Sequence, residues 1–127
     1  MADLSAIMQM IAMDPRWRDN GVMFSTGGLI QAVAASTSYT LFTRSSNRAV
    51  WLYALHVYND NDSLARISIG TGDFTANMPQ FGPVLSDYSE LFVFPPREFR
   101  ANIVAQSTVG AASPSEVEIQ AYVFEVR

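Results

Sequence analysis

The spacing of apolar residues changes near residue 21, from a helical period to the period of two that strands show. Before that point, four apolar residues fall at positions i, i+3, i+4 and i+7, which form one face of a helix. These residues are Leu4, Ile7, Met8 and Ile11. Asp3 is placed to cap the first turn, and Asp14-Pro15 should end the helix, because the residue before a proline is pushed out of the α region. We therefore predict a helical arm at residues 1–20 and a strand-rich domain at 21–127.

Alternation of apolar and polar residues is clearest near the C-terminus. There, Val117, Ile119, Ala121 and Val123 alternate with Glu116, Glu118, Gln120 and Tyr122. A strand that buries one face requires this pattern. Other short segments have strand composition bounded by turn residues: 21–25, 28–35, 38–43, 49–59, 64–70, 89–94 and 101–107. These features predict an all-β fold, an antiparallel β-sandwich of the jelly-roll or immunoglobulin-like kind, preceded by a short amphipathic helix.

Prolines and turn residues set the expected interruptions between strands. Residues 71–87 have little periodicity and two prolines, so we expect a long surface loop of the kind that often carries contacts. Pro95-Pro96 should stop the strand that begins at residue 89, and the composition of residues 110–115 predicts another loop.

The segment 49–59 is almost entirely apolar and should be buried on both faces, or on one face and an interface. Strict alternation places Trp51, Tyr53 and Leu55 on one side and Leu52, Ala54 and His56 on the other. Both sides then need a cover. Tryptophan and most phenylalanines are expected to fill the core, although exposed aromatic rings could also stack on sugars.

The segment HVYNDNDSLARISIGTGD, residues 56–73, carries the only histidine, a run of acidic and amide residues, and a Gly-Thr-Gly. Asp60 and Asp62 could supply the first two oxygen ligands of a calcium loop, but Leu64 and Ala65 occupy positions where that loop needs a ligand and a glycine. Gly70 and Gly72 are not accompanied by the third glycine and the following helix that a dinucleotide-binding site requires. No lysine is present to complete a P-loop. The pattern favours a β-hairpin with a solvated turn; Asp60 and Asp62 stay candidate metal ligands, and no cofactor is expected.

Candidate catalytic residues are few. The sequence has no cysteine, one histidine and no Gly-x-Ser-x-Gly motif, so a nucleophilic triad has no visible scaffold. His56 is interpreted as a packing residue that could also sense pH at an interface. Glu116 and Glu118 share one strand face, about 7 Å apart by strand rise, and could form the carboxylate pair of a small hydrolase. An exposed acidic face explains them equally well, and we expect no enzyme.

Charge narrows the choice of partners. The net charge is −4 and the eight basic residues, all arginine, are scattered, so the sequence has no electrostatic footprint for nucleic acid. The apolar segment at 4–13 is shorter than the roughly 20 residues that cross a bilayer, and no membrane partner is expected. The chain is 49% hydrophobic but only 16% charged, which suggests that a protein partner covers part of its surface.

The predicted helix has two interpretations. It could pack on the core of its own domain, or it could dock on a neighbouring subunit, for which its methionines would give an adaptable surface. The predicted loop is a second possible contact. The residues expected at an interface are Leu4, Ile7, Met8 and Ile11 of the helix and Phe74, Met78 and Phe81 of the loop.

The segments WLYALHVYNDNDSLARISIGTGD, FPPREFRANIV and VEIQAYVFEV resemble the small β-sandwich accessory proteins of virus particles, especially the decoration or cement proteins of tailed-phage heads. The resemblance extends over residues 38–126 as a style of strand, Asn/Asp turn and strand. It implies a non-enzymatic structural protein of the virion that forms a homo-oligomer, commonly a trimer, and binds a lattice of capsid or other virion protein. The alternative is a lectin-like sandwich that binds carbohydrate through exposed aromatics and the Asp60/Asp62 turn.

Overall fold

The computed structural model describes residues 4–27, 39–44, 49–61, 63–70, 80–108 and 116–126. These residues include the helix α1 (Leu4–Met13), as the sequence predicts, and a short 3-10 helix (Arg18–Asn20). The strands are β1 (Val22–Thr26), β2 (Tyr39–Phe42), β3 (Val50–Asp60), β4 (Ala65–Gly70), β5 (Gln80–Val84), β6 (Tyr88–Phe99), β7 (Ile103–Ser107) and β8 (Glu116–Val126). The predicted strand at 28–35, the predicted loop at 110–115 and the capping residue Asp3 lie outside the described residues.

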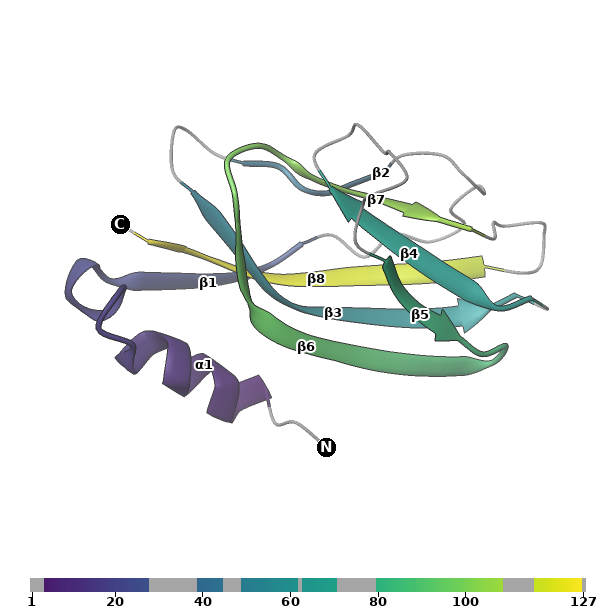
Figure 1. Ribbon diagram of the computed structural model, residues 1–127, viewed down its shortest axis with the longest axis horizontal. Coiled ribbons are helices and arrows are strands. Elements are labelled where there is room, and N and C mark those ends of the chain that lie inside the picture. Colours follow the sequence, from purple (N-terminus) through teal and green to yellow (C-terminus); the bar gives the residue numbers. More distant parts are fainter. Residues whose placement is uncertain are drawn as a thin grey trace.

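The strands form two antiparallel sheets, in the orders β1-β8-β3-β6 and β2-β7-β4-β5. Figure 1 shows them as two layers, with α1 against the outer face of the first sheet. β1 pairs with β8, β2 with β7, β3 with β6, and β4 with β5. The chain is thus one long hairpin of strand pairs folded over on itself, which is the jelly-roll arrangement. The predicted antiparallel sandwich is confirmed, and the strand order selects the jelly roll over the immunoglobulin-like alternative.

The main core lies between the two sheets. On β8 the predicted alternation is confirmed, because Val117, Ile119, Ala121 and Val123 are all buried. The core cluster around them contains large aliphatic residues from both sheets, including Leu52, Leu55, Ile67 and Ile103. Burial of these side chains is the main favourable term for the sandwich.

An irregularity in β3 changes which of its side chains face this core. The pairing of β3 with β8 shifts between Leu52 and Ala54, so Tyr53 is an extra residue in the strand. Every side chain beyond such a bulge changes face. Leu52 and Leu55 therefore both join the core between the sheets, while Tyr53 and Ala54 both lie in a second cluster on the outer face. The predicted grouping of Leu55 with Tyr53, and of Leu52 with Ala54, is wrong for this reason.

β6 continues through Pro95-Pro96, contrary to the expectation that the prolines end the strand. Its pairing with β3 passes from Ala54↔Val93 to Leu52↔Arg97, so residues 94–96 lie in a bulge opposite Tyr53. β6 is also an edge strand of its sheet. Proline lacks a backbone donor, but edge strands and bulges do not need one at every position.

β5 lies inside the segment that was predicted to be loop. The strand escapes prediction because its five residues include Gly82 and Pro83, which ordinarily mark turns. Gly82 has a φ of 119°, and a Cβ atom at this residue would lie 2.7 Å from the carbonyl oxygen of Ala65. The position therefore needs glycine, both for its backbone conformation and for the close approach of β4.

The predicted β-hairpin at residues 56–70 is also corrected. The turn after Asp60 joins β3 of the first sheet to β4 of the second, and these two strands do not pair with each other. Sequence signals for a strand, a turn and a returning strand are the same whether the chain returns within a sheet or crosses to the other one. The long-range pairing decides between them.

Candidate interaction surface

The outer face of the first sheet carries an apolar cluster that α1 partly covers. The buried members of this outer cluster are Ile11, Trp17, Tyr53, Ala54 and Phe124. Trp17 comes from the segment after the helix, where the ring centroid lies 5.3 Å from that of Trp51 and 5.0 Å from that of Phe124. Both contacts are edge-to-face, an arrangement that aromatic rings favour. Trp17 thus joins the helical segment to β3 and β8.

The predicted helical interface residues lie on this cluster. Ile11 is buried in it, and Leu4, Ile7 and Met8 pack against it half-buried. The helix therefore covers the core of its own domain, as in the first of the two interpretations. None of the described helices is long and apolar enough to cross a membrane. A contact of these four residues with a neighbouring subunit stays a prediction.

Tyr53 occupies the centre of the outer cluster. Its ring lies 6.0 Å from the rings of Phe24 and Phe124 and 6.4 Å from that of Tyr122. Burial raises the pKa of the Tyr53 hydroxyl, and the nearby Tyr122 adds to the shift. A neutral phenol is compatible with an apolar site, so Tyr53 acts as a packing residue here.

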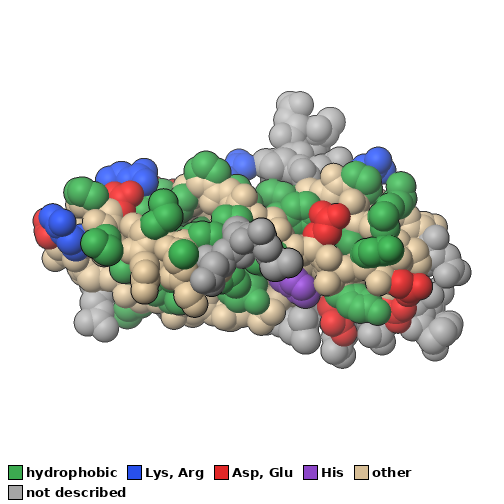
Figure 2. Space-filling view, turned by 90° about the horizontal axis from the view of Figure 1, so that it is seen from below, with side chains coloured by type: hydrophobic (Ala, Val, Ile, Leu, Met, Phe, Trp, Pro, Cys, Tyr) green, Lys and Arg blue, Asp and Glu red, His purple; other side chains and the backbone are tan. Residues whose placement is uncertain are grey.

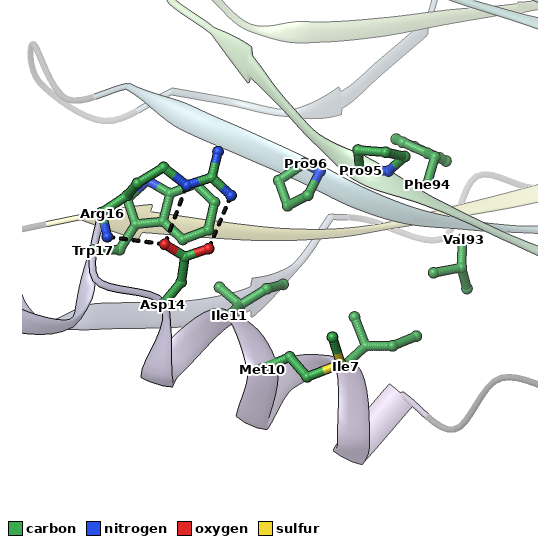
Figure 3. A pocket seen from close by; sticks show the side chains of 10 residues that line it. All are labelled: Ile7, Met10, Ile11, Asp14, Arg16, Trp17, Val93, Phe94, Pro95 and Pro96. Atoms are coloured by element: carbon green, nitrogen blue, oxygen red, sulfur yellow. Dashed lines mark hydrogen bonds and ion pairs between the residues drawn. The ribbon is translucent and has the colours of Figure 1, made fainter.

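A hollow of about 300 Å³ lies between α1 and β6. Figure 3 shows Ile7, Met10 and Ile11 on the helix side, with Phe94, Pro95 and Pro96 across from them on β6. The space is lined mainly by apolar side chains.

An ion pair closes one end of this hollow. The Asp14 carboxylate accepts hydrogen bonds from Nε of Arg16 at 3.1 Å and from its Nη2 at 2.9 Å. The bonds from Arg16 lower the pKa of Asp14 and raise that of Arg16. The guanidinium also lies over the ring of Trp17, 4.2 Å from its centroid. The charges at this rim therefore neutralise each other.

A second hollow, of about 220 Å³, opens at the edge of the sandwich between β5 and β6. Phe94 and Pro95 line it, as they line the first hollow, and Phe81 faces them from β5. The Phe81 ring lies 5.7 Å from that of Phe92 and 5.1 Å from that of Phe94. Phe81 was an expected interface residue; the other two from that segment, Phe74 and Met78, lie outside the described residues.

The Asn59 side chain organises the described part of the turn that carries the candidate metal ligands Asp60 and Asp62. The Asn59 side chain is fully buried and donates to the carbonyl oxygens of Ser63 at 2.8 Å and Val84 at 2.9 Å. Its Oδ1 accepts from the backbone N–H of Asn61 at 3.0 Å. Asp60 is exposed at the end of β3, and Asp62 lies outside the described residues. Within the described ranges, no three His, Cys, Asp or Glu residues are grouped as metal ligands.

Acidic groups gather near this turn on the outer face. Asp60, and to a lesser degree Asp87 and Glu118, raise the pKa of Tyr58 because an ionised phenol would be repelled by their carboxylates. Tyr88, which is 61% exposed and follows Asp87 directly, pairs with the buried Asn59 and therefore lies on the opposite face of the sheet from Tyr58. The outer face at this end of the sheet combines the Tyr58 ring with carboxylates.

The candidate catalytic residues lie on the same end of the sheet without forming a recognisable catalytic arrangement in the described region. Glu118 pairs across from Tyr58, and the Glu116 backbone pairs with Asp60, although the Glu116 side chain is outside the described part. His56 is half-buried opposite Gln120 on β8 and Leu91 on β6. Their strand positions place these residues in the polar half of the outer face of the first sheet.

The outer face is thus divided along its length. Figure 2 views it directly: acidic side chains on the left adjoin basic ones, whereas those on the right stand apart from them, near the purple histidine. The ion pairs at the helical end include Asp14–Arg16 and Arg18–Asp19. One end of the face is apolar and electrically balanced, and the other is acidic.

Comparison with known proteins gives no family. No protein-family model matches the sequence, and no curated protein matches it. Among solved structures, one similar chain comes from work on Bacillus endospore appendages, described as a novel family of disulfide-linked pili. The two chains are 13% identical, the match covers 84% of this chain and 91% of that one, and the TM-score is 0.47. The strand pairing described above, and not this likeness, defines the protein as a jelly roll.

The sequence patterns do not predict several residues of the candidate interaction surface. Trp17 follows the predicted end of the helix, and Phe94, Pro95 and Pro96 were interpreted only as the end of a strand. The signal that could have found Trp17 is an isolated aromatic one turn beyond an amphipathic helix. For residues 94–96, a diproline inside an otherwise strand-like segment is itself typical of an edge strand with a bulge.

Proposed function

We propose that the protein is a non-enzymatic structural component of a virion, a capsid decoration or minor capsid protein that binds a protein lattice as a homo-oligomer. One observation supports this most: Phe94 and Pro95 on edge strand β6 line two apolar hollows at once. Expected interface residues line both hollows, with Ile7 and Ile11 in the first and Phe81 in the second.

Apolar hollows at a sheet edge suit a contact with another protein. A partner side chain that enters such a hollow leaves water and gains about 25 cal/mol for each Å² of apolar surface buried. Prolines at the centre of β6 discourage the addition of a foreign strand along this edge. The contact is therefore made by side chains, which gives a defined docking position.

The experiment measures co-sedimentation of the purified protein with particles assembled without it. Pro95→Glu places a charge at the boundary of the two hollows, on an exposed residue, and is expected to lower particle binding at least ten-fold. Thr40→Glu, at an exposed residue of β2 in the other sheet, is the matched control and should leave binding unchanged. Equal binding by wild type and Pro95→Glu would remove this surface from the proposal.

Deletion of residues 1–15 tests the helical arm. The variant should lose particle binding if the arm contributes Leu4, Ile7, Met8 and Ile11 to the contact, or if the hollow between α1 and β6 is needed. A protein that stays monomeric at high concentration and binds particles equally well without residues 1–15 would contradict the role of the arm.

The acidic end of the outer face favours a second candidate function, a carbohydrate-binding module. The Tyr58 ring lies on this face, and the carboxylates of Asp60 and Glu118 beside it could accept hydrogen bonds from sugar hydroxyls. A glycan array with and without calcium separates this candidate from the first. Silence under both conditions would exclude it.

A further inference from the structure

The outward face of α1 is unusual for a helix on a protein surface because it carries no charge. None of the ten residues of the helix is charged, and six are exposed: Ser5, Ala6, Gln9, Met10, Ala12 and Met13. Met10 is 73% exposed and Met13 is 71% exposed. Surface helices ordinarily carry charged residues on their solvent side, and a helix that lacks them is usually buried.

α1 also forms a ridge with an apolar hollow on each side. The hollow toward β6, of about 300 Å³, has Met10 as one of its lining residues. The hollow toward β1, of about 210 Å³, is lined mainly by Leu4, Met8, Phe24, Tyr53 and Tyr122. A ridge beside a hollow is complementary to itself, since the ridge of one copy can enter the hollow of another.

Charge indicates which partner fits this surface. The chain has a net charge of −4, so two copies repel each other unless they meet away from their acidic ends. At the helical end Asp14 pairs with Arg16 and Arg18 with Asp19, which leaves the surface balanced. The carboxylates around Tyr58 lie at the opposite end of the face. Two copies that meet at α1 therefore keep their acidic ends apart, which reduces the repulsion between them.

We propose that α1 packs against α1 of a second copy about a two-fold axis, with Met10 of each copy in the hollow between α1 and β6 of the other. A two-fold axis across the helices makes them antiparallel, so that their dipoles oppose each other favourably. The small side chains of Ala6 and Ala12 allow the two helices to approach closely. This contact deepens the proposed function, on which it rests for the expectation of a homo-oligomer.

The size of the surface limits the strength of the contact. A ten-residue helix is about 15 Å long and about 10 Å wide, and the flanking hollows roughly double the area, to about 300 Å² for each copy. Stable interfaces bury about 800 Å² for each partner. The pair is therefore weak in free solution and effective where a lattice already holds two copies close together.

Disulfide trapping tests the geometry directly, because the chain contains no cysteine of its own. Met10→Cys places one thiol at the proposed axis, and Thr40→Cys places one on an exposed residue of the other sheet. Under mild oxidation at equal concentration, Met10→Cys should form a covalent dimer at least ten-fold faster than Thr40→Cys. Adding Met13→Asp to Met10→Cys should slow dimer formation to the rate of the control.

The outcomes separate this contact from the proposed function. Equal cross-linking rates for the two cysteine variants would overturn the α1 pairing, even if sedimentation showed an oligomer, because another surface would then mediate it. Particle binding that persists in such a case would leave the proposed function intact. In sedimentation velocity at high concentration, Met10→Asp should also contain a smaller fraction of dimer than the wild-type protein. Its circular-dichroism melt should be unchanged, which would show that the fold is kept.

Discussion

Asn59 supports the sharpest stability prediction because its fully buried side chain makes three hydrogen bonds to backbone atoms. Asn59→Ala removes two donated bonds and one accepted bond, at 2.8, 2.9 and 3.0 Å. Each intramolecular bond contributes about 0.5–1.5 kcal/mol net, and a buried carbonyl left unsatisfied adds to the loss. We expect Asn59→Ala to lower the free energy of unfolding by about 2–4 kcal/mol.

Asn59→Asp is the more diagnostic change, since its shape is almost unaltered. The carboxylate can still accept from the N–H of Asn61, but it faces the carbonyl oxygens of Ser63 and Val84 as a third acceptor. An uncompensated buried charge costs about 3–5 kcal/mol. Asn59→Asp should therefore be at least as destabilising as Asn59→Ala at neutral pH. The penalty should shrink at about pH 3, where most carboxyls are protonated and the group can again donate one bond.

Urea denaturation at the two pH values measures both variants. Asp60→Asn is the control, because it makes the reverse chemical change at the exposed neighbouring residue and should alter stability little. The reasoning is refuted if the free energy of unfolding of Asn59→Asp is within about 1 kcal/mol of wild type at neutral pH, because the hydrogen bonds to the carbonyl oxygens of Ser63 and the buried Val84 could not then have been lost.

Three further predictions concern single residues. Gly82→Ala should destabilise the fold by about 1–3 kcal/mol, because it combines a φ of 119° with a Cβ atom 2.7 Å from a carbonyl oxygen; thermal melting measures it. Trp17→Ala should cost about 3–5 kcal/mol and expose the outer cluster, as measured by urea denaturation and dye binding. Asp60→Asn should lower the pKa of Tyr58 in a spectrophotometric titration, and by more than Glu118→Gln does, because Asp60 makes the larger contribution to raising it.

Controls for these predictions lie close to each site. Leu85→Ala, at a half-exposed residue near Gly82, should leave the melting temperature nearly unchanged, and Arg18→Ala should do so beside Trp17. An unaltered Tyr58 titration in Asp60→Asn would mean that the two side chains are farther apart in solution than the fold places them. A Trp17→Ala variant as stable as wild type would show that the helical segment is not anchored by this ring.

Local patterns in the sequence predict local structure well. The spacing of Leu4, Ile7, Met8 and Ile11 is visible without any knowledge of the fold, and so is the alternation along β8, because each depends only on which face is buried. The same patterns cannot show that β3 and β4 belong to different sheets. That depends on pairing between residues far apart in the chain, which no local signal records.

The candidate interaction surface could be predicted only in part, because it too depends on strand pairing that local patterns do not show. The expectation that residues 49–59 need a cover on both sides is met by the core and by the outer cluster, yet the residues on each side differ from strict alternation. A bulge in an all-apolar strand leaves no trace in the hydrophobic pattern, since both faces accept apolar residues. The expected contact residues Ile7, Ile11 and Phe81 line hollows that Phe94 and Pro95 also line. The sequence pattern predicts only the end of a strand at Pro95-Pro96, so it does not reveal these hollows.

The two irregularities that escaped prediction occur at the same level of the sheet, and together they position the candidate surface. The extra residue Tyr53 in β3 lies opposite residues 94–96 of β6. The bulge in β3 turns both Tyr53 and Ala54 outward, which provides the platform on which α1 and Trp17 pack. The bulge in β6 places Phe94 and Pro95 between the two hollows. Changes that restore regular pairing here, such as deletion of both Pro95 and Pro96, should therefore disturb the packing of α1 and the edge contact together. Changes at the acidic end should affect neither.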